Sequence, residues 1–306
     1  MTTKINIVFM GGFTYPHGMA GTKRIQNAIN ALKEYPDITT RVILQRQSSE
    51  DNTLAGVHAG TPYETVMGDL FRTKMFVALP ILYYRTIATL KRAFRYNYKN
   101  VIYFYGPLFF DSIVPLSYAR RLGYKIIFDV IEDFGLARDV ARSAYHYMRG
   151  NIAHRLSLRI KDLSAGNIVI SSYLEDQCRK ISHGKVPLHY MPISVDMNCF
   201  PEKTTTKNNT VSLFYAGSFG IKDGLPLLLD AFDRLAGRYA NVRLVLTGRG
   251  DREAMKDFFT RMERSPNKDR IEYKGYLEEN AYYSLLNDIE IPCMSRVDLA
   301  YAHAGF

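Results

Sequence analysis

A glycine-rich stretch over residues 11–21 (GGFTYPHGMAG) lies between an apolar run and a helical pattern. Glycines let a ligand approach the backbone closely, and the helix N-terminus behind them offers free N–H groups to an anion. They are Gly11, Gly12, Gly18 and Gly21. Neither GxGxxG nor GxxxxGK[ST] occurs, so the stretch is not a standard dinucleotide or P-loop fingerprint. It predicts either a phosphate site or a tight structural turn.

Two cations follow this stretch directly. Lys23 and Arg24 stand in the predicted first helical turn, where the helix dipole disfavours positive charge. An anion bound nearby would explain the placement, and so would a solvated pair.

The loop 217–224 (GSFGIKDG) repeats the design between a later strand and helix. Its Lys222 could reach a phosphate and neutralise charge on a leaving diphosphate, which is an electrostatic form of catalysis. The alternative is a surface lysine in a turn.

A third loop, 129–135 (DVIEDFG), follows a predicted strand at the end where open α/β sheets bind ligands. Asp129, Glu132 and Asp133 could accept a hydrogen bond from a sugar hydroxyl or act as a base. Their spacing is not diagnostic of a metal site, and Asp133 could instead cap the next helix.

Other familiar chemistries lack a signature. The three cysteines form no CxxC pair, and His146 and His154 are eight residues apart rather than four. Neither a GxSxG elbow nor a kinase motif occurs. We therefore expect no metal site and no disulfide framework, and a reducing compartment fits.

The apolar pattern alternates between strand-like and helix-like segments, which predicts parallel sheets covered on both faces. Strands are predicted at 5–10, 41–45, 101–105, 124–130, 166–171, 186–191, 211–216, 242–247, 271–274 and 289–294. Helices are predicted from Thr22 and at 72–97, 108–122, 136–162, 172–181, 225–238, 252–263 and 278–287. The predicted fold class is α/β, with two doubly wound Rossmann-like domains.

A polar run at 200–210 divides the chain. We expect an N-terminal domain over 1–199, a linker over 200–210 and a C-terminal domain over 211–306, with a cleft between the two domains. The second domain has four predicted strands where a Rossmann-like half has about six, so it is expected to be incomplete. We therefore expect the chain to be truncated at its C-terminus.

The net charge of +10 lies in the first 199 residues, which hold 25 Lys and Arg against 15 Asp and Glu. The stretch 70–110 has no acidic residue and mixes basic with aromatic side chains. It could be a core helix with a solvated basic face or a surface for anionic lipid. Nucleic-acid binding is disfavoured because no RRM, KH or zinc-finger motif occurs.

The sequence contains neither a signal-peptide pattern nor an apolar run of the roughly 18–20 residues that span a bilayer. We expect a cytoplasmic protein, with peripheral attachment to the inner membrane face as the alternative.

Five segments in order resemble glycosyltransferase family 4, whose members are retaining enzymes of the GT-B fold. Residues 11–24 resemble its N-terminal glycine-rich loop, and 191–200 (MPISVDMNCF) its interdomain stretch. Three further segments, 213–232, 244–251 and 271–294, resemble its donor domain. The final AHAGF resembles the start of its phosphate-binding loop.

The resemblance implies transfer of a sugar from a nucleotide-sugar donor with retention, usually without a metal or other cofactor. The donor would be UDP- or GDP-linked, and the acceptor would bind mainly the first domain. Glu132 or Asp133 would face the reacting sugar and, with Lys222, make up the catalytic set. The implied donor-binding residues are Gly12, Gly18, Gly21, Ser218, Lys222, Gly248, Tyr276, Ala304, Gly305 and Phe306.

The chain departs from the family pattern in two places. The family commonly has an arginine where Ser218 stands, so Lys222 would carry more of the phosphate charge. The family's Glu–seven residues–Glu motif, which orients the sugar and the ribose, lies beyond Phe306.

The leading functional hypothesis is a hexosyltransferase that acts on a lipid-linked or polysaccharide acceptor in cell-envelope glycan synthesis. The alternatives are a nucleotide-sugar epimerase of the same fold and a truncated, inactive sugar-nucleotide-binding protein, because a fold does not determine a reaction.

Overall fold

The computed structural model describes residues 3–50, 52–69, 75–133, 135–136, 144–197, 209–220 and 223–298. The described chain divides between Val195 and Asp196 into two compact units, here called the N-terminal and the C-terminal unit. Most of the stretch 200–210, predicted as a linker, lies outside the described residues.

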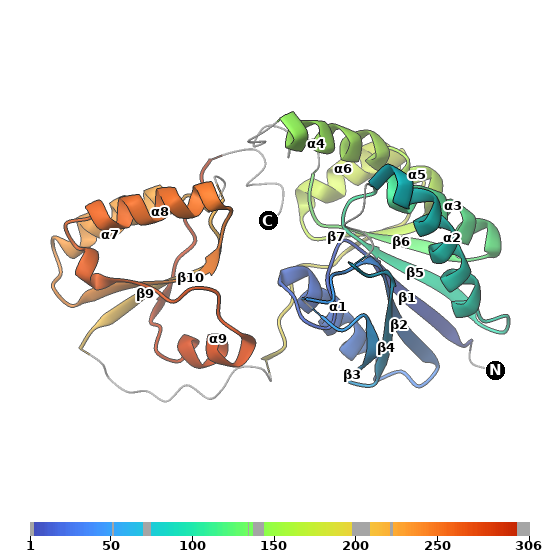
Figure 1. Ribbon diagram of the computed structural model, residues 1–306, viewed down its shortest axis with the longest axis horizontal. Coiled ribbons are helices and arrows are strands. Elements are labelled where there is room, and N and C mark those ends of the chain that lie inside the picture. The colour runs from blue at the N-terminus through green and yellow to red at the C-terminus, as the bar shows by residue number, and fades with distance from the viewer. Residues whose placement is uncertain are drawn as a thin grey trace. The chain divides into compact units, whose positions relative to one another are not determined.

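The N-terminal unit is built on one sheet of eight strands (Figure 1). The strand order is β3-β4-β2-β1-β5-β6-β7-β8, and every neighbouring pair is parallel except β3 and β4. The strands are β1 Ile5–Gly11, β2 Ile38–Arg46, β3 Ala55–His58, β4 Thr61–Met67, β5 Lys99–Tyr105, β6 Lys125–Val130, β7 Ser164–Val169 and β8 Leu188–Tyr190. The predicted doubly wound sheet is confirmed.

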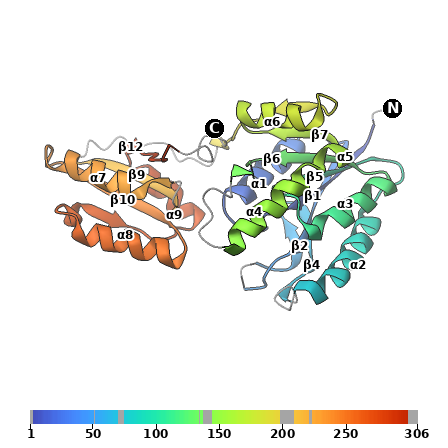
Figure 2. The ribbon, with the colours of Figure 1, turned by 90° about the horizontal axis from the view of Figure 1, so that it is seen from above.

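Helices cover both faces of this sheet. They are α1 Ala20–Leu32, α2 Met75–Ala93, α3 Phe110–Leu122, α4 Ala144–Ser157, α5 Ile160–Leu163 and α6 Ser172–Ser182. Ile25 and Ile29 of α1 pack with Phe9 of β1 on one face. The helices α2, α3 and α5 pack on the other face, with Leu90 and Leu116 against Ile102 and Phe128 among others. Figure 2 shows α2, α3 and α4 side by side.

The segment predicted as one helix over 136–162 is divided where the structure describes it. The helix α4 ends at Ser157 and α5 begins at Ile160. The Arg159 N–H donates to the Leu156 carbonyl at 2.9 Å, which is a turn of the i→i−3 type rather than an α-helical bond. The prediction was therefore wrong about a single continuous helix.

The β3–β4 hairpin was missed by the sequence patterns. Ala59 and Gly60, both with positive φ, form its two-residue turn, a geometry that suits tight hairpins. Val57 pairs with Pro62, and a proline within a run argues against a strand unless the strand lies near an edge. The hairpin forms that edge of the sheet.

The helix α2, which lies within the basic, aromatic stretch 70–110, has a buried and an exposed side. Leu82, Leu90 and Ala93 are buried, whereas Tyr84 is 76% exposed and Arg85 is exposed. Among the described residues, no helix combines the length and the apolar character that crossing a membrane requires.

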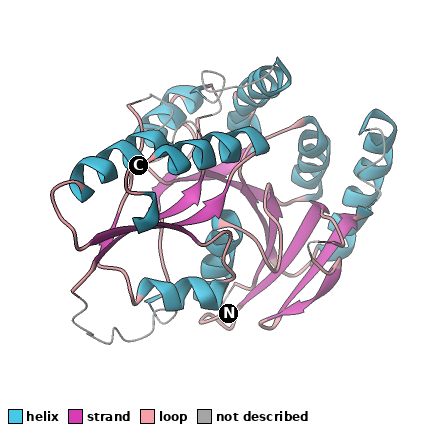
Figure 3. Cartoon of the chain, turned by 60° about the vertical axis from the view of Figure 1, so that its left-hand side comes forward, coloured by secondary structure: helices cyan, strands magenta, loops and turns pink. Residues whose placement is uncertain are grey.

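The C-terminal unit has a four-stranded parallel sheet in the order β11-β10-β9-β12. Its strands are β9 Val211–Ser218, β10 Val242–Arg249, β11 Ile271–Tyr273 and β12 Ile291–Pro292. The helices α7 Leu225–Ala236 and α8 Arg252–Arg264 pack on one face, and α9 Glu279–Leu286 packs on the other. Figure 3 shows helices flanking the strands in each unit.

Two strands, one in each unit, have a glycine of the same geometry at or next to their last residue. Gly11 of β1 has φ +130°, and a Cβ there would lie 2.1 Å from the Tyr105 carbonyl oxygen of β5. Gly248 of β10 has φ +133°, and a Cβ there would lie 1.9 Å from the Gly217 carbonyl oxygen of β9. Only glycine fits because both the dihedral angle and the neighbouring backbone exclude a side chain.

Adjacent glycines at the end of β1 should therefore respond differently to one added methyl group. Gly11→Ala should lower the free energy of unfolding by about 2–4 kcal/mol through strain and overlap. Gly12→Ala should change it by less than about 0.5 kcal/mol, since its Cβ would be 3.8 Å from the nearest atom. Urea denaturation measures both, and equal losses for the two variants would contradict this account.

Candidate functional site

A buried ion pair joins α1 to the carboxyl end of β6. The Arg24 Nε and Nη2 donate to the two Asp129 carboxylate oxygens at 2.6 and 2.9 Å. Asp129 is fully buried, and the Arg24 side chain is 9% exposed. Tyr103 donates its hydroxyl to the same carboxylate at 2.6 Å. Three hydrogen bonds from groups of the chain itself thus hold Asp129.

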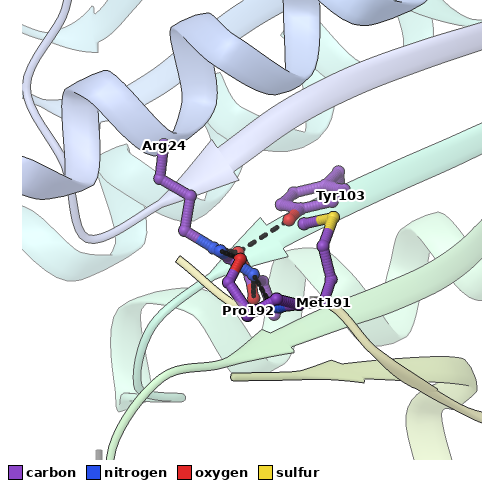
Figure 4. Close-up of polar contacts among 5 residues, drawn as sticks. Arg24, Tyr103, Met191 and Pro192 are labelled. Atoms are coloured by element: carbon purple, nitrogen blue, oxygen red, sulfur yellow. Dashed lines mark hydrogen bonds and ion pairs between the residues drawn. The ribbon is translucent and has the colours of Figure 1, made fainter. Parts of the chain in front are cut away.

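Arg24 also holds the segment that follows β8. Its guanidinium donates to the Met191 and Pro192 carbonyl oxygens, both at 3.2 Å (Figure 4). Asn27, one turn further along α1, donates to the Ser194 carbonyl oxygen at 3.2 Å. One helix therefore fixes two segments that are distant in the sequence.

The electrostatics agree with this geometry. Burial raises the pKa of the Tyr103 hydroxyl, and the Asp129 carboxylate raises it further. Burial alone would lower the pKa of Arg24, but the hydrogen bonds and charge of Asp129 raise it above its usual value. The interpretation of Arg24 as a solvated cation is wrong, because the anion that it meets is a buried carboxylate of this chain.

The three glycines predicted to bind the donor in the N-terminal unit have different surroundings. A Cβ on Gly18 would lie 2.1 Å from the Thr22 hydroxyl, and one on Gly21 would lie 2.9 Å from the Tyr105 ring. Internal packing therefore accounts for both glycines without a ligand. Gly12 is exposed and has room around it, so its surroundings are those that a ligand could approach.

Glu132 and Asp133 lie just beyond the end of β6, as expected. The Asp133 carboxylate accepts hydrogen bonds from the Gly135 N–H and the Tyr173 hydroxyl, both at 2.8 Å. Burial, together with this hydrogen bond, raises the pKa of Tyr173 to about 12. Glu132, Asp133 and His154 line one pocket within the N-terminal unit.

Three predicted donor residues of the C-terminal unit gather at one edge of its sheet. Ser218 ends β9, Gly248 lies next to the end of β10, and Tyr276 follows β11. The Gly248 N–H donates to the Gly275 carbonyl oxygen at 3.0 Å, which connects the last two of these strand ends. These are the carboxyl ends of parallel strands, where ligands of such sheets bind.

Sequence reasoning missed Arg249 at this edge. In the sheet register Arg249 lies directly opposite Ser218, and its guanidinium carbon is 4.7 Å from the centre of the Tyr276 ring. It thus places a cation next to the position where the family pattern has an arginine. The signal was available in the segment 244–251, because Arg249 stands three residues after the apolar run 244–246 of a predicted strand.

The loop after β9 is held by Asp223. Its carboxylate accepts from the Ser218 hydroxyl at 2.6 Å and from the Gly220 N–H at 3.0 Å. The Ser295 hydroxyl donates to the Asp223 carbonyl oxygen at 2.8 Å. The Ser218 hydroxyl therefore donates its hydrogen bond within the loop, so towards a ligand it can act mainly as a hydrogen-bond acceptor.

Four predicted site residues lie outside the described part of the chain, namely Lys222, Ala304, Gly305 and Phe306. Within the part that is described, no group of three or more His, Cys, Asp and Glu side chains is arranged to hold a metal ion.

The Arg24–Asp129 pair should be essential to the N-terminal unit. Removing one partner leaves a buried charge uncompensated, so Arg24→Met should cost about 3–5 kcal/mol of unfolding free energy. The double variant Arg24→Met/Asp129→Leu should lose less. Exposed Lys125→Met is the control and should change stability by less than about 0.5 kcal/mol. Chemical denaturation decides, and a loss for Arg24→Met as small as the control would refute the role of the pair.

No family model and no curated protein sequence matches the chain. Solved structures do match. Sucrose-phosphate synthase from Thermosynechococcus elongatus aligns with 99% of this chain and 77% of its own, at 13% identity and a TM-score of 0.68. Anabaena Alr3699/HepE in complex with UDP-glucose aligns with 95% of this chain and 74% of its own, at 13% identity and a TM-score of 0.63.

A UDP-N-acetylglucosamine 2-epimerase is also similar, at 10% identity and a TM-score of 0.58, over 95% of this chain and 74% of its own. At such identities the likeness concerns the fold. The two sheets with their helices are the Rossmann-like domains of the GT-B architecture.

Proposed function

We propose that the protein is a retaining glycosyltransferase of family 4, which moves a hexose from a nucleotide-diphosphate sugar to a lipid-linked or polysaccharide acceptor in cell-envelope glycan synthesis. The observation that carries the proposal is the gathering of Ser218, Gly248, Arg249 and Tyr276 at the carboxyl edge of one parallel sheet. The GT-B fold, shared with a UDP-glucose-bound structure, supports it.

In this reaction the anomeric carbon exchanges its bond to a diphosphate oxygen for a bond to an acceptor oxygen, and the acceptor hydroxyl passes its proton to the departing diphosphate or to a nearby carboxylate. The departing nucleoside diphosphate gains negative charge, so cations at its site stabilise the transition state. Arg249 and Lys222 are the proposed cations, and the nucleotide base lies beside Tyr276. Glu132 or Asp133 is proposed to face the reacting sugar and the acceptor hydroxyl.

The proposal includes a cytoplasmic location with peripheral binding to the inner membrane face through the stretch 70–110. Exposed Tyr84 and Arg85 on α2 support this part, because aromatic and basic side chains suit an anionic interface. Flotation with vesicles of anionic lipid should be strong at low salt and lost at high salt. A protein that stays unbound at low salt would contradict this part alone.

Incubation with a panel of UDP-, GDP- and ADP-sugars tests the reaction. We expect one donor to be consumed when an acceptor is present, and a product whose anomeric configuration, read by NMR, equals that of the donor. Donor alone is the essential control, because an epimerised sugar without acceptor would favour the epimerase. Nucleotide binding with no turnover would favour an inactive binding protein.

Donor-site variants should weaken nucleotide binding. Arg249→Ala removes a charge-assisted contact worth about 1.5–3 kcal/mol, so the affinity for the nucleoside diphosphate should fall at least about tenfold. Lys222→Ala should also weaken binding. Tyr276→Ala should cost at least about fivefold if the base stacks on the ring.

Matched controls lie at the amino ends of the strands of the same sheet, opposite to the proposed donor site. Arg238 and Tyr239 are exposed and precede β10, so Arg238→Ala and Tyr239→Ala should leave the affinity unchanged. Calorimetric titration compares the five variants. If the variants at the amino ends weakened binding as much as those at the carboxyl ends, the donor would not bind specifically at the carboxyl ends.

A further inference from the structure

The N-terminal unit contains a pocket on the face of the sheet that carries α5. Residues of α4, α5 and α6 line it, together with Val130 at the end of β6 and Asn167 of β7. Its cavity volume of about 80 Å³ exceeds several times the roughly 10–15 Å³ that one water molecule requires. It is therefore large enough for an organic group.

The walls of the pocket are largely apolar. Leu174, Cys178 and Ile181 lie at positions i, i+4 and i+7 of α6, so they form one stripe that faces the pocket. Val130 and Ile160 complete the apolar lining. Such walls favour a hydrocarbon, because burying it removes apolar surface from water.

One end of the pocket is polar and reaches the candidate site. Glu132, Asp133 and His154 line this end, and Asp133 is fixed by its bonds to Gly135 and Tyr173. A ligand that fills the pocket from this end would keep its polar part beside the two carboxylates. The pocket is thus continuous with the residues proposed to face the acceptor hydroxyl.

Polar side chains also line the pocket beyond this end, namely Ser157, Lys161, Asn167, Gln177 and Ser182, the last residue of α6. Ser182 is 4% exposed, and among the described side chains its Oγ is one of the buried atoms without a hydrogen-bond partner. Because this Oγ has no partner in the unliganded chain either, a hydrocarbon beside it adds no further desolvation cost.

We propose that this pocket binds the hydrocarbon part of a lipid-linked acceptor, in the position that brings the acceptor hydroxyl to Glu132 and Asp133. This inference rests on the proposed transferase function and selects the lipid-linked acceptor over the polysaccharide.

Binding of hexyl, octyl and decyl glucosides to the full chain, each below its critical micelle concentration, tests the pocket directly. Calorimetry should show the affinity rising about fourfold for each methylene that is buried, until the pocket is filled. Equal affinities for all three glucosides would overturn the proposal.

A matched pair of variants identifies the location. Cys178→Phe fills the pocket and should abolish the dependence on chain length, whereas Cys178→Ser keeps its volume and should retain that dependence. The same dependence in Cys178→Phe would place the alkyl chain elsewhere and overturn the proposal.

The unaltered protein provides a second measurement in case Cys178→Phe fails to fold. Cys178 is buried, and burial with the charge of Asp133 raises the pKa of its thiol to about 11. Decyl glucoside should slow the alkylation of Cys178 by N-ethylmaleimide several-fold, as read by peptide mass spectrometry. Cys293 of the C-terminal unit is the internal control, and equal protection of both thiols would contradict the proposal.

Kinetics separate this inference from the transferase proposal. With the donor identified, a lower KM for octyl glucoside than for methyl glucoside, lost in Cys178→Phe, supports the pocket. Transfer to both glucosides with equal KM supports the transferase and overturns the pocket. Chain-length-dependent binding at the pocket with no transfer to any acceptor overturns the transferase, and with it the role as an acceptor site.

Discussion

The buried Arg24–Asp129 pair is the constraint on which the N-terminal unit depends. Burying a guanidinium and a carboxylate costs free energy unless both form hydrogen bonds. Here the guanidinium binds the carboxylate through two hydrogen bonds, and it donates two more to the Met191 and Pro192 carbonyl oxygens. The contacts tie α1, the end of β6 and the segment after β8 together. Glu132 and Asp133 follow Asp129 within four residues, so their position depends on this pair.

Each unit also has one glycine, at or next to the last residue of a strand, whose position excludes any side chain. Gly11 and Gly248 adopt nearly the same φ, and in each the backbone of the neighbouring strand occupies the space of a side chain. In the N-terminal unit this leaves Gly12 exposed at the start of the loop, next to a fully packed strand end.

Much of the fold could be predicted from the sequence, because buried parallel strands produce short apolar runs with helical patterns between them. The hairpin at Gly56–Tyr63 was missed because its strands are partly polar and one contains a proline. The glycine-rich loop was recognised, but not that Gly21 packs on Tyr105, which lies 84 residues away. The Arg24–Asp129 pair spans 105 residues and has no local signal. Contacts of this kind arise from strand order, which a motif does not contain.

Strand order also explains how a cation can lie beside Ser218 in the sheet although it is distant from Ser218 in the sequence. A sequence motif is compared one position at a time, so the serine at position 218 suggests that a cation of the family pattern is missing here. In the parallel register Arg249 of β10 stands beside Ser218 of β9, and the Tyr276 ring holds its guanidinium at 4.7 Å. A bound diphosphate is attracted by charge at the sheet edge, whichever strand supplies it. The proposed site therefore depends on the edge as a whole, and Ser218 alone does not argue against it.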